Sequence, residues 1–312
     1  MDEKKIGVRR LMAVAAVLLI LCLGIALAFE TLFILIGGSA TAFPFGGLSP
    51  VISDNKVGVI YVEGQLVTDN VADGSGYSSS VNVVKELRDA QNDKSIKAIV
   101  LRVDSPGGSP VAAEEIYSQI LKTKAVKPVV VSMGDMATSA AYYISAPCSR
   151  IVAYPDSFTG SIGVIWTFQN RSEYYSDVGT SYYVAESGTY KDVGADYRGL
   201  NDSEKEYARA IVDEAYERFV NSVAQGRNMS YEDVKKLADG RAYTGAEARR
   251  LGLVDDLGGL YDAIDTAARL GNVSGTPVVT YVNQDSASGM LLAGQGRNST
   301  ITSLYSGGMV ET

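Results

Sequence analysis

A serine, a lysine and a complete lack of histidine limit the chemistry that is open to this chain. Ser139 lies in the segment GDMATSAAYY (134–143), and Lys191 is the only lysine between Lys127 and Lys205. A serine hydroxyl needs a base before it can attack an acyl carbon, and the lack of imidazole excludes a Ser-His-Asp site. The base must then be a Lys, Asp, Glu or Tyr side chain, and lysine can serve when apolar surroundings lower its pKa from about 10.4 to about 7–8. Ser139 and Lys191 therefore form a chemically coherent nucleophile and general base.

A glycine-rich turn is the second feature that could take part in chemistry. The segment DSPGGSP (104–110) directly follows an apolar run that is rich in β-branched residues. Its backbone N–H groups, next to the N-terminus of a helix, could bind an oxyanion. Two simpler interpretations remain open at this point. The turn could only connect a strand to a helix, and Ser139 could only cap a helix.

These segments need a scaffold, and the hydrophobic pattern predicts one. Continuous apolar strands that alternate with amphipathic helices indicate an α/β fold with a mostly parallel sheet, covered by helices on both faces. The expected strands are 57–64, 96–103, 128–134, 150–154 and 181–187, with a possible edge strand at 277–282. The expected helices are 81–92, 111–124, 139–146, 203–225, 231–238, 246–251 and 261–270. Both reactive segments then follow the carboxyl ends of strands, where sites form in such sheets.

The N-terminus predicts a membrane anchor. Residues 11–29 carry no charge, and 19 helical residues span about 28 Å, close to the thickness of the bilayer core. A cleaved signal peptide is the alternative, but its apolar region usually runs over only about 7–15 residues. Basic residues before the anchor place the N-terminus in the cytoplasm and the remaining chain on the other side. We expect a cytoplasmic segment (1–10), an anchor (11–36), a linker (37–55), a catalytic domain (56–271) and a C-terminal strand and tail (272–312).

The overall composition excludes some other classes of function. A net charge of −8 argues against a nucleic-acid-binding surface, which would need a basic face. The two cysteines, Cys22 and Cys148, are too far apart in the sequence to indicate a zinc cluster. We expect Cys148 to be a small buried residue.

Taken together, the segments resemble the signal peptide peptidase A family, whose members are membrane-anchored Ser/Lys proteases. The similarity runs from about residue 57 to residue 270, and it lies in five segments in the family's order: 102–110, 132–145, 158–165, 186–192 and 238–259. The single catalytic repeat behind an anchor resembles the family's short form. One departure is Ala140–Ala141, where most members have two glycines.

The resemblance implies a fold, a set of site residues and an assembly. The fold would be the Clp protease/crotonase type, a repeated β-β-α superhelix. Ser139 would be the nucleophile, Lys191 the general base, Gly108 and Ala140 the oxyanion hole, and Ser161 the residue that orients the lysine. No metal or organic cofactor is implied. The enzyme would form a homo-oligomer, an octameric ring in which neighbouring subunits share each site. Its substrates would be apolar peptides, such as signal-peptide remnants and segments of misfolded membrane or secreted proteins.

Three other functions are compatible with parts of the pattern. A related membrane Ser/Lys peptidase acts on stomatin-like partners, but it would carry further transmembrane helices after the protease domain. A crotonase-type acyl-CoA enzyme could use the glycine turn for a thioester oxyanion, although it has little use for an anchor or a Ser/Lys pair. A scaffold without catalytic activity could bind peptides. The presence of both Ser139 and Lys191 argues against the scaffold.

Overall fold

The computed structural model describes residues 55–72 and 75–283 of the chain. Contacts divide the chain into two units, Met1–Ile52 and Ser53–Thr312, and all described residues belong to the second. The predicted anchor, nearly all of the linker and most of the predicted tail lie outside the described residues. Within the described ranges, no helix is long and apolar enough to cross a membrane.

A parallel sheet is the centre of the described unit, as the apolar strands predict. Its strand order is β10-β1-β4-β5-β6-β9, and every neighbouring pair on this path is parallel. These strands are β1 (Lys56–Glu63), β4 (Ile96–Ser105), β5 (Val129–Thr138), β6 (Arg150–Ala153), β9 (Asp256–Leu257) and β10 (Val278–Tyr281). Two short strands extend it, since β7 (Phe158–Gly160) pairs with β5 and β8 (Ala242–Thr244) pairs with β7. A separate small sheet joins β2 (Gln65–Val67) to β3 (Tyr77–Ser79).

Seven of the eight described helices correspond to predicted ones, with ends shifted by one or two residues. They are α2 (Ser80–Asn92), α3 (Pro110–Lys124), α4 (Ala140–Ser145), α6 (Asp202–Arg227), α7 (Tyr231–Leu237), α8 (Gly245–Arg250) and α9 (Leu260–Leu270). The eighth, α5 (Ser172–Asp177), was not expected from the sequence, and none of its residues is buried. Side chains define several helix starts. Asn201 and Glu204 form a capping box at α6, and Ser109 caps α3 ahead of Pro110.

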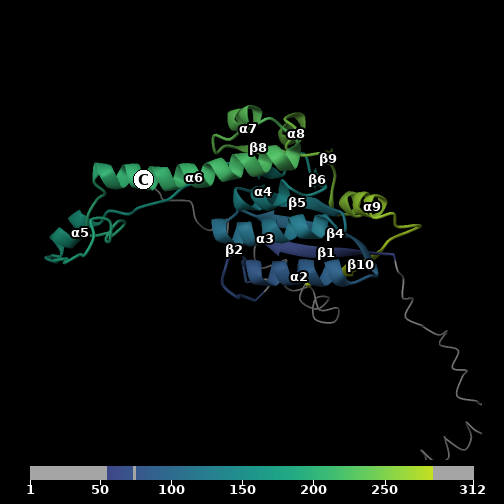
Figure 1. The fold of residues 1–312 in the computed structure, drawn as a ribbon, viewed down its shortest axis with the longest axis horizontal. Helices are drawn as coiled ribbons and strands as arrows, with labels where there is room; N and C mark the ends of the chain where they lie inside the picture. Colours follow the sequence, from purple (N-terminus) through teal and green to yellow (C-terminus); the bar gives the residue numbers. More distant parts are fainter. Residues whose placement is uncertain (1–54, 73–74, 284–312) are drawn as a thin grey trace, which may run out of the picture. The chain divides into compact units, whose positions relative to one another are not determined.

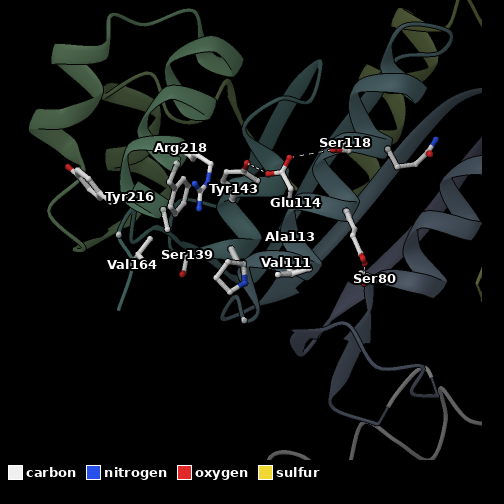
Figure 2. Close-up of a pocket in the computed structure, with 18 of the residues that line it drawn as sticks. Ser80, Val111, Ala113, Glu114, Ser118, Ser139, Tyr143, Val164, Tyr216 and Arg218 are labelled. Atoms are coloured by element: carbon white, nitrogen blue, oxygen red, sulfur yellow. Dashed lines mark hydrogen bonds between the residues drawn. The ribbon is translucent and has the colours of Figure 1, made fainter. Parts of the chain in front are cut away.

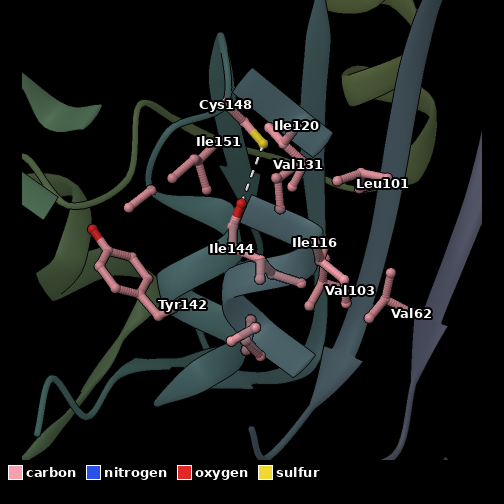
Figure 3. Close-up of a cluster of buried hydrophobic side chains, with 14 of the residues drawn as sticks. Val62, Leu101, Val103, Ile116, Ile120, Val131, Tyr142, Ile144, Cys148 and Ile151 are labelled. Atoms are coloured by element: carbon pink, nitrogen blue, oxygen red, sulfur yellow. Dashed lines mark hydrogen bonds between the residues drawn. The ribbon is translucent and has the colours of Figure 1, made fainter. Parts of the chain in front are cut away.

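The two faces of the sheet are buried against different helices (Figure 1). On β1, Ile60 and Val62 face the core under α2, α3 and α4, whereas Val57 and Val59 face α9. The alternation follows from the two-residue period of a strand, and burial on both sides explains why the strands read as continuous apolar runs. Figure 3 shows the larger core, in which Cys148 is buried as predicted. Burial raises the pKa of its thiol to about 12.

The predicted strand at residues 181–187 is wrong. The segment has no strand partner in the described part of the chain, and Tyr183 is 94% exposed. Its tyrosines instead make ring contacts, since Tyr182 stacks on Tyr197 with ring centroids 4.9 Å apart and packs edge-on against Tyr175. Aromatic and β-branched residues favour strands only where a neighbouring strand and a buried face are available, and this segment has neither.

Candidate active site

Three neighbouring strands bring the predicted site segments together at one end of the sheet. β4 leads into the glycine turn, β5 into Ser139, and β7 into Ser161. The strand register pairs Ser105 with Ala137, and Thr138 with Gly160. Because these parallel strands end side by side, residues more than 50 positions apart in sequence meet at this edge.

Ser139 has an unusual backbone conformation between β5 and α4. Its φ is 55° and its ψ is −125°, a region that costs a non-glycine residue about 1–3 kcal/mol. Hydrogen bonds hold it there, because its N–H donates to the Gly160 carbonyl at 2.9 Å and its carbonyl accepts from Tyr143 N–H at 2.9 Å. Its side chain does not cap α4 and has no hydrogen-bond partner among the described residues. The helix-cap interpretation is therefore wrong, and the hydroxyl is available to a substrate.

The glycine turn packs directly against Ser139. A Cβ atom on Gly107, where φ is +100°, would lie 2.9 Å from Ser139 Cβ and from Ala140 N. A Cβ atom on Gly108 would lie even closer to the backbone of Leu66, 2.2 Å from its carbonyl oxygen. Leu66 pairs with the turn, since its N–H donates to the Gly107 carbonyl (2.8 Å) and its carbonyl accepts from Ser109 N–H (2.9 Å). Only glycine fits both positions, so the turn is more than an ordinary connection between a strand and a helix.

Two backbone N–H groups beside Ser139 remain available as donors. Within residues 55–72 and 75–283, neither the Gly108 nor the Ala140 amide donates to a protein oxygen. Ala140 is also the first residue of α4, where the helix dipole favours negative charge. These amides have the chemistry that an oxyanion hole requires.

A half-buried carboxyl group supports the irregular end of β5. Asp104 Oδ1 accepts a hydrogen bond from Met136 N–H at 3.1 Å, next to a break in the β4–β5 register. A Cβ on Gly134 would lie 2.7 Å from the Asp104 carboxyl carbon, so this glycine leaves room for the acid. Burial raises the pKa of Asp104. We infer that Asp104 holds the backbone that leads to Ser139.

Ser161 lines the same groove as Ser139. Its φ is 48°, and its N–H donates to the Arg241 carbonyl at 2.9 Å. The hydroxyl donates to the Gly240 carbonyl at 3.1 Å, which leaves the oxygen lone pairs able to accept a hydrogen bond from an incoming amine.

A groove of about 1910 Å³ runs past Ser139 (Figure 2). Part of its lining is apolar or aromatic, namely Val111, Ala113, Tyr143, Val164, Ile165, Tyr216 and Phe219, and charged side chains such as Arg88, Glu115 and Arg218 line other parts. Tyr143 donates to Glu114 at 2.5 Å and accepts from Ser222 at 3.3 Å, which joins α3, α4 and α6 across the groove. Burial, with a smaller effect of the hydrogen bond to Glu114, raises the pKa of Tyr143, so it remains a neutral donor.

Lys191 lies elsewhere in the same subunit and does not line this groove. Next to it, Tyr190 packs on Tyr207 of α6 with ring centroids 5.2 Å apart. On the serine side, Tyr143 packs on Phe219 of α6, also at 5.2 Å. Twelve residues separate the two contacts on α6, and at about 1.5 Å per residue they lie about 18 Å apart along the helix. The two predicted catalytic side chains of one chain are therefore not brought together.

The two lysines that do line the groove are poorly suited to be the base. Lys122 lies twelve residues from the start of α3, about 18 Å along that helix from the glycine turn. Lys85 forms an ion pair with Asp89 at 2.7 Å, and this hydrogen bond raises the pKa of the lysine. A general base needs the opposite shift.

Among the residues that the structure describes, no group of three acidic or cysteine side chains is arranged to hold a metal ion. The assembled features are those of acyl transfer: a strained serine, two amide donors and a groove with apolar and aromatic side chains in its lining.

Comparison with known proteins agrees with this chemistry. The sequence profile of peptidase family S49 matches residues 122–274, and that of the Clp proteases matches residues 66–155. A protein of Synechocystis that is named as a protease is 40% identical over 204 residues, which are 65% of this chain and 72% of the relative. The chain belongs to peptidase family S49.

Two further relatives have more specific names. An Enterococcus faecium protein named as a signal peptide peptidase, SppA, is 37% identical over 65% of this chain and 59% of its own length. The chloroplastic serine protease SPPA of Arabidopsis thaliana is 33% identical over 64% of this chain, which is only 30% of the relative. The S49 protein described here is accordingly a serine protease, and its mostly parallel α/β fold is of the Clp protease type.

Several residues of this S49 site had no distinct signal in the sequence. Asp104 and Tyr143 lie within the two segments that could do chemistry, but an acid before a turn and a tyrosine inside a helix are common and indicated no role. The pairing of Leu66 with the glycine turn depends on β2, a strand too short to recognise. The one available signal for Asp104 was Gly134, a glycine predicted to end a strand. A glycine inside or at the end of a strand can leave room for a side chain from a neighbouring strand, here Asp104.

Proposed function

We propose that this S49 serine protease cleaves peptides with a Ser139/Lys191 dyad. The geometry of Ser139 supports it, because a strained serine next to two available amides is arranged for acyl transfer. Gly108 and Ala140 supply the oxyanion hole, and Ser161 orients the lysine. Removing one such donor typically lowers kcat by about 10²–10³-fold.

The reaction proceeds through an acyl-enzyme. Lys191, in its neutral form, takes the proton of the Ser139 hydroxyl while the oxygen attacks the peptide carbonyl. The C–N bond then breaks, and the lysine ammonium returns the proton to the leaving amine. Water repeats the sequence on the ester, releases the carboxylic acid and restores the serine.

Each dyad is shared between neighbouring subunits of a homo-oligomer, which we propose to be an octameric ring. The observation that carries this proposal is the separation of Lys191 from the groove of its own chain. A lysine side chain cannot bridge a distance of about 18 Å along α6. The segment that carries Lys191 also exposes large apolar side chains, among them Ile165, Tyr174 and Tyr183, as expected of a surface that packs on another subunit.

The proposed substrates are extended apolar peptides, such as signal-peptide remnants, at the outer face of the cell membrane. The apolar walls of the groove support this class, and so does the name of the Enterococcus relative. Residues 11–29 support a single-pass anchor with the N-terminus in the cytoplasm and the catalytic domain outside. A peptide could bind by adding a strand next to the short edge at β2.

The test mixes two inactive proteins, Ser139→Ala and Lys191→Ala, each full-length and in detergent. If neighbouring subunits share the dyad, co-assembled sites that combine an intact serine with an intact lysine regain peptidase activity. Peptide hydrolysis is measured before and after subunit exchange. A mixture that exchanges subunits and stays completely inactive contradicts the shared dyad.

Labelling by a fluorophosphonate separates catalysis from peptide binding alone. We expect the wild type to be labelled at Ser139 and Lys191→Ala to be labelled far more slowly. An oligomeric wild type that binds peptides but takes no label would favour a scaffold. Binding of an acyl-CoA without labelling would favour the crotonase-type reaction.

A further inference from the structure

The segment that carries Lys191 has little else to hold it in place. Between Ser161 and α6 the chain forms only one short helix, and residues 179–191 are all exposed. Lys191 itself uses its N–H to bond the Gly188 carbonyl at 2.9 Å. Its ammonium forms no hydrogen bond or ion pair with any residue that the structure describes. We call residues 186–200 the lysine arm.

One arginine ties the arm to the body of the subunit. Arg198 donates to both carboxylate oxygens of Asp192, the residue next to Lys191, with Nε at 2.8 Å from Oδ2. The same guanidinium donates to both oxygens of Glu204 in the first turn of α6, at 2.8 and 2.6 Å. Tyr197 adds a hydrogen bond to Asp192 at 2.9 Å. The planar guanidinium thus bridges two carboxylates and makes two bonds to each.

The carboxylate on α6 is buried, which makes this bridge more than a surface ion pair. The Glu204 side chain is 0% exposed and that of Asp192 is 14% exposed. Glu204 also accepts the Asn201 N–H at 2.9 Å as part of the capping box of α6. It is therefore fixed to a rigid helix. Without Arg198 the two carboxylates would face each other unbalanced, and their repulsion would push the arm away from α6.

The bridge also occupies Asp192, the acid next to Lys191 in the sequence. A free Asp192 could form an ion pair with the lysine ammonium, which would raise the pKa of the lysine and weaken it as a base. The other charged or titratable groups on the arm are Glu186, Tyr190, Asp196 and Tyr197. Those that face it from other elements are Arg171, Tyr175 and Tyr182 on the preceding segment, and Glu204 and Tyr207 on α6. Of these, Asp192 is the one adjacent in sequence to Lys191, and Arg198 neutralises it.

We propose that Arg198 is a positioning residue for the protease reaction: it fixes the lysine arm to α6 so that Lys191 reaches the Ser139 of a neighbouring subunit. This inference rests on the proposed shared dyad. Arg198 does not touch the substrate. It acts through Asp192 on one side and Glu204 on the other.

The shared dyad allows a test that a general folding role would not satisfy. In the mixture of Ser139→Ala with Lys191→Ala, the first protein supplies the lysine and the second supplies the serine. Arg198→Gln is added to the lysine supplier in one mixture and to the serine supplier in another. We expect at least a tenfold loss of recovered activity in the first mixture and less than a twofold change in the second.

A matched control is available on the same segment. Arg171 forms a longer, exposed pair with Asp196 at 4.0 Å. Arg171→Gln on the lysine supplier should leave the recovered activity within twofold. Equal losses from Arg198→Gln on either supplier would overturn the inference, because they would indicate a general effect on folding or assembly. No recovery in the parent mixture, before Arg198 is changed, would instead contradict the shared dyad.

A milder variant covers the case in which Arg198→Gln does not fold. Asp192→Asn keeps the Arg198–Glu204 pair and weakens only the link between Arg198 and residue 192, next to Lys191. On the lysine supplier it should also lower the recovered activity, with kcat reduced more than KM is raised. Unchanged kcat for this variant would overturn the inference.

The pH profile of kcat/KM gives a second measurement if Arg198→Gln folds. Asp192 would then be free to pair with Lys191, so the acid limb of the profile should move to higher pH. An acid limb at an unchanged pH would count against that part of the proposal.

Discussion

At the scale of single residues, the site depends on glycines, because a Cβ atom at these positions would collide with neighbouring backbone. Gly108 has a φ of +152°, and a Cβ there would lie 2.2 Å from the Leu66 carbonyl oxygen. No side chain at this position can avoid that contact unless the turn moves away from β2. Moving the turn would carry the Gly108 amide away from Ser139.

Gly108→Ala should therefore lower kcat by about 10²–10³-fold, the usual effect of losing one oxyanion donor. Steady-state peptide hydrolysis measures it, with thermal unfolding as a check on the fold. Gly179→Ala is the matched control, because Gly179 also has a positive φ (+70°) but nothing lies within 4 Å of its would-be Cβ. It should cost about 1–2 kcal/mol of stability and leave kcat nearly unchanged. Equal kcat for the two variants would contradict the proposed role of Gly108.

At the scale of elements, α6 links the serine and the lysine arm within each subunit. Its C-terminal half packs into the core through Phe219, Val220 and Val223, whereas its first turns hold the arm. The capping box at Asn201 and the Arg198 bridge meet in the same turn. A disturbance of α6 packing should therefore affect both ends of the helix.

Gly226, near the end of α6, tests this close packing. Replacing a helical glycine by alanine usually stabilises a helix by about 1 kcal/mol. Here a Cβ would lie 2.3 Å from the Ala146 carbonyl oxygen at the end of α4. We expect Gly226→Ala to lower the free energy of unfolding by about 1–3 kcal/mol, as overpacking does. Gln225→Ala, exposed in the same turn, should change it by less than about 0.5 kcal/mol in denaturant titrations. A more stable Gly226→Ala would contradict this packing.

The bridge at the start of α6 has a defined dependence on pH. Hydrogen bonds from Arg198 hold the pKa of Asp192 below its ordinary 3.8 and that of Glu204 below 4.5. A carboxylate whose pKa is lower in the folded state stabilises the fold above its unfolded pKa, and the effect is lost as the pH falls through the folded value. The bridge therefore acts in full above about pH 5.

The stability difference between wild type and Asp192→Asn should accordingly be constant from pH 8 to pH 6 and shrink below about pH 4. Denaturant titrations at a series of pH values measure it. A difference that already disappears between pH 7 and pH 6 would contradict the bridge. If the difference stays constant between pH 7 and pH 6, any loss of peptidase activity in that range reflects protonation of the lysine base and not release of the arm.

At the scale of the whole molecule, the proposed sharing of each site between two subunits would make activity depend on assembly. The full-length protein should lose specific activity on dilution, in parallel with the loss of oligomers. Peptide hydrolysis and sedimentation velocity at matched concentrations measure the two quantities. Constant specific activity while the oligomer dissociates to monomers would contradict a dyad shared between subunits.

The sequence by itself restricted the chemistry and predicted the main scaffold of this protein. The lack of histidine excluded imidazole as the base, and the apolar runs predicted five of the eight strands of the sheet, but not β7, β8 or β9. Both follow from local properties, namely residue type and periodicity. The exposed tyrosines of 181–187 misled the prediction because the preference for a strand depends on neighbours that the sequence does not reveal.

Only the tertiary structure decided how the site residues meet. It joined the ends of β4, β5 and β7 so that the glycine turn, Ser139 and Ser161 share one edge, and it gave Ser139 its strained φ. It also separated Lys191 from the groove of its own chain and revealed the bridge of Arg198 to Asp192 and Glu204. Strand register and helix length set these distances, and both depend on contacts between residues far apart in the sequence.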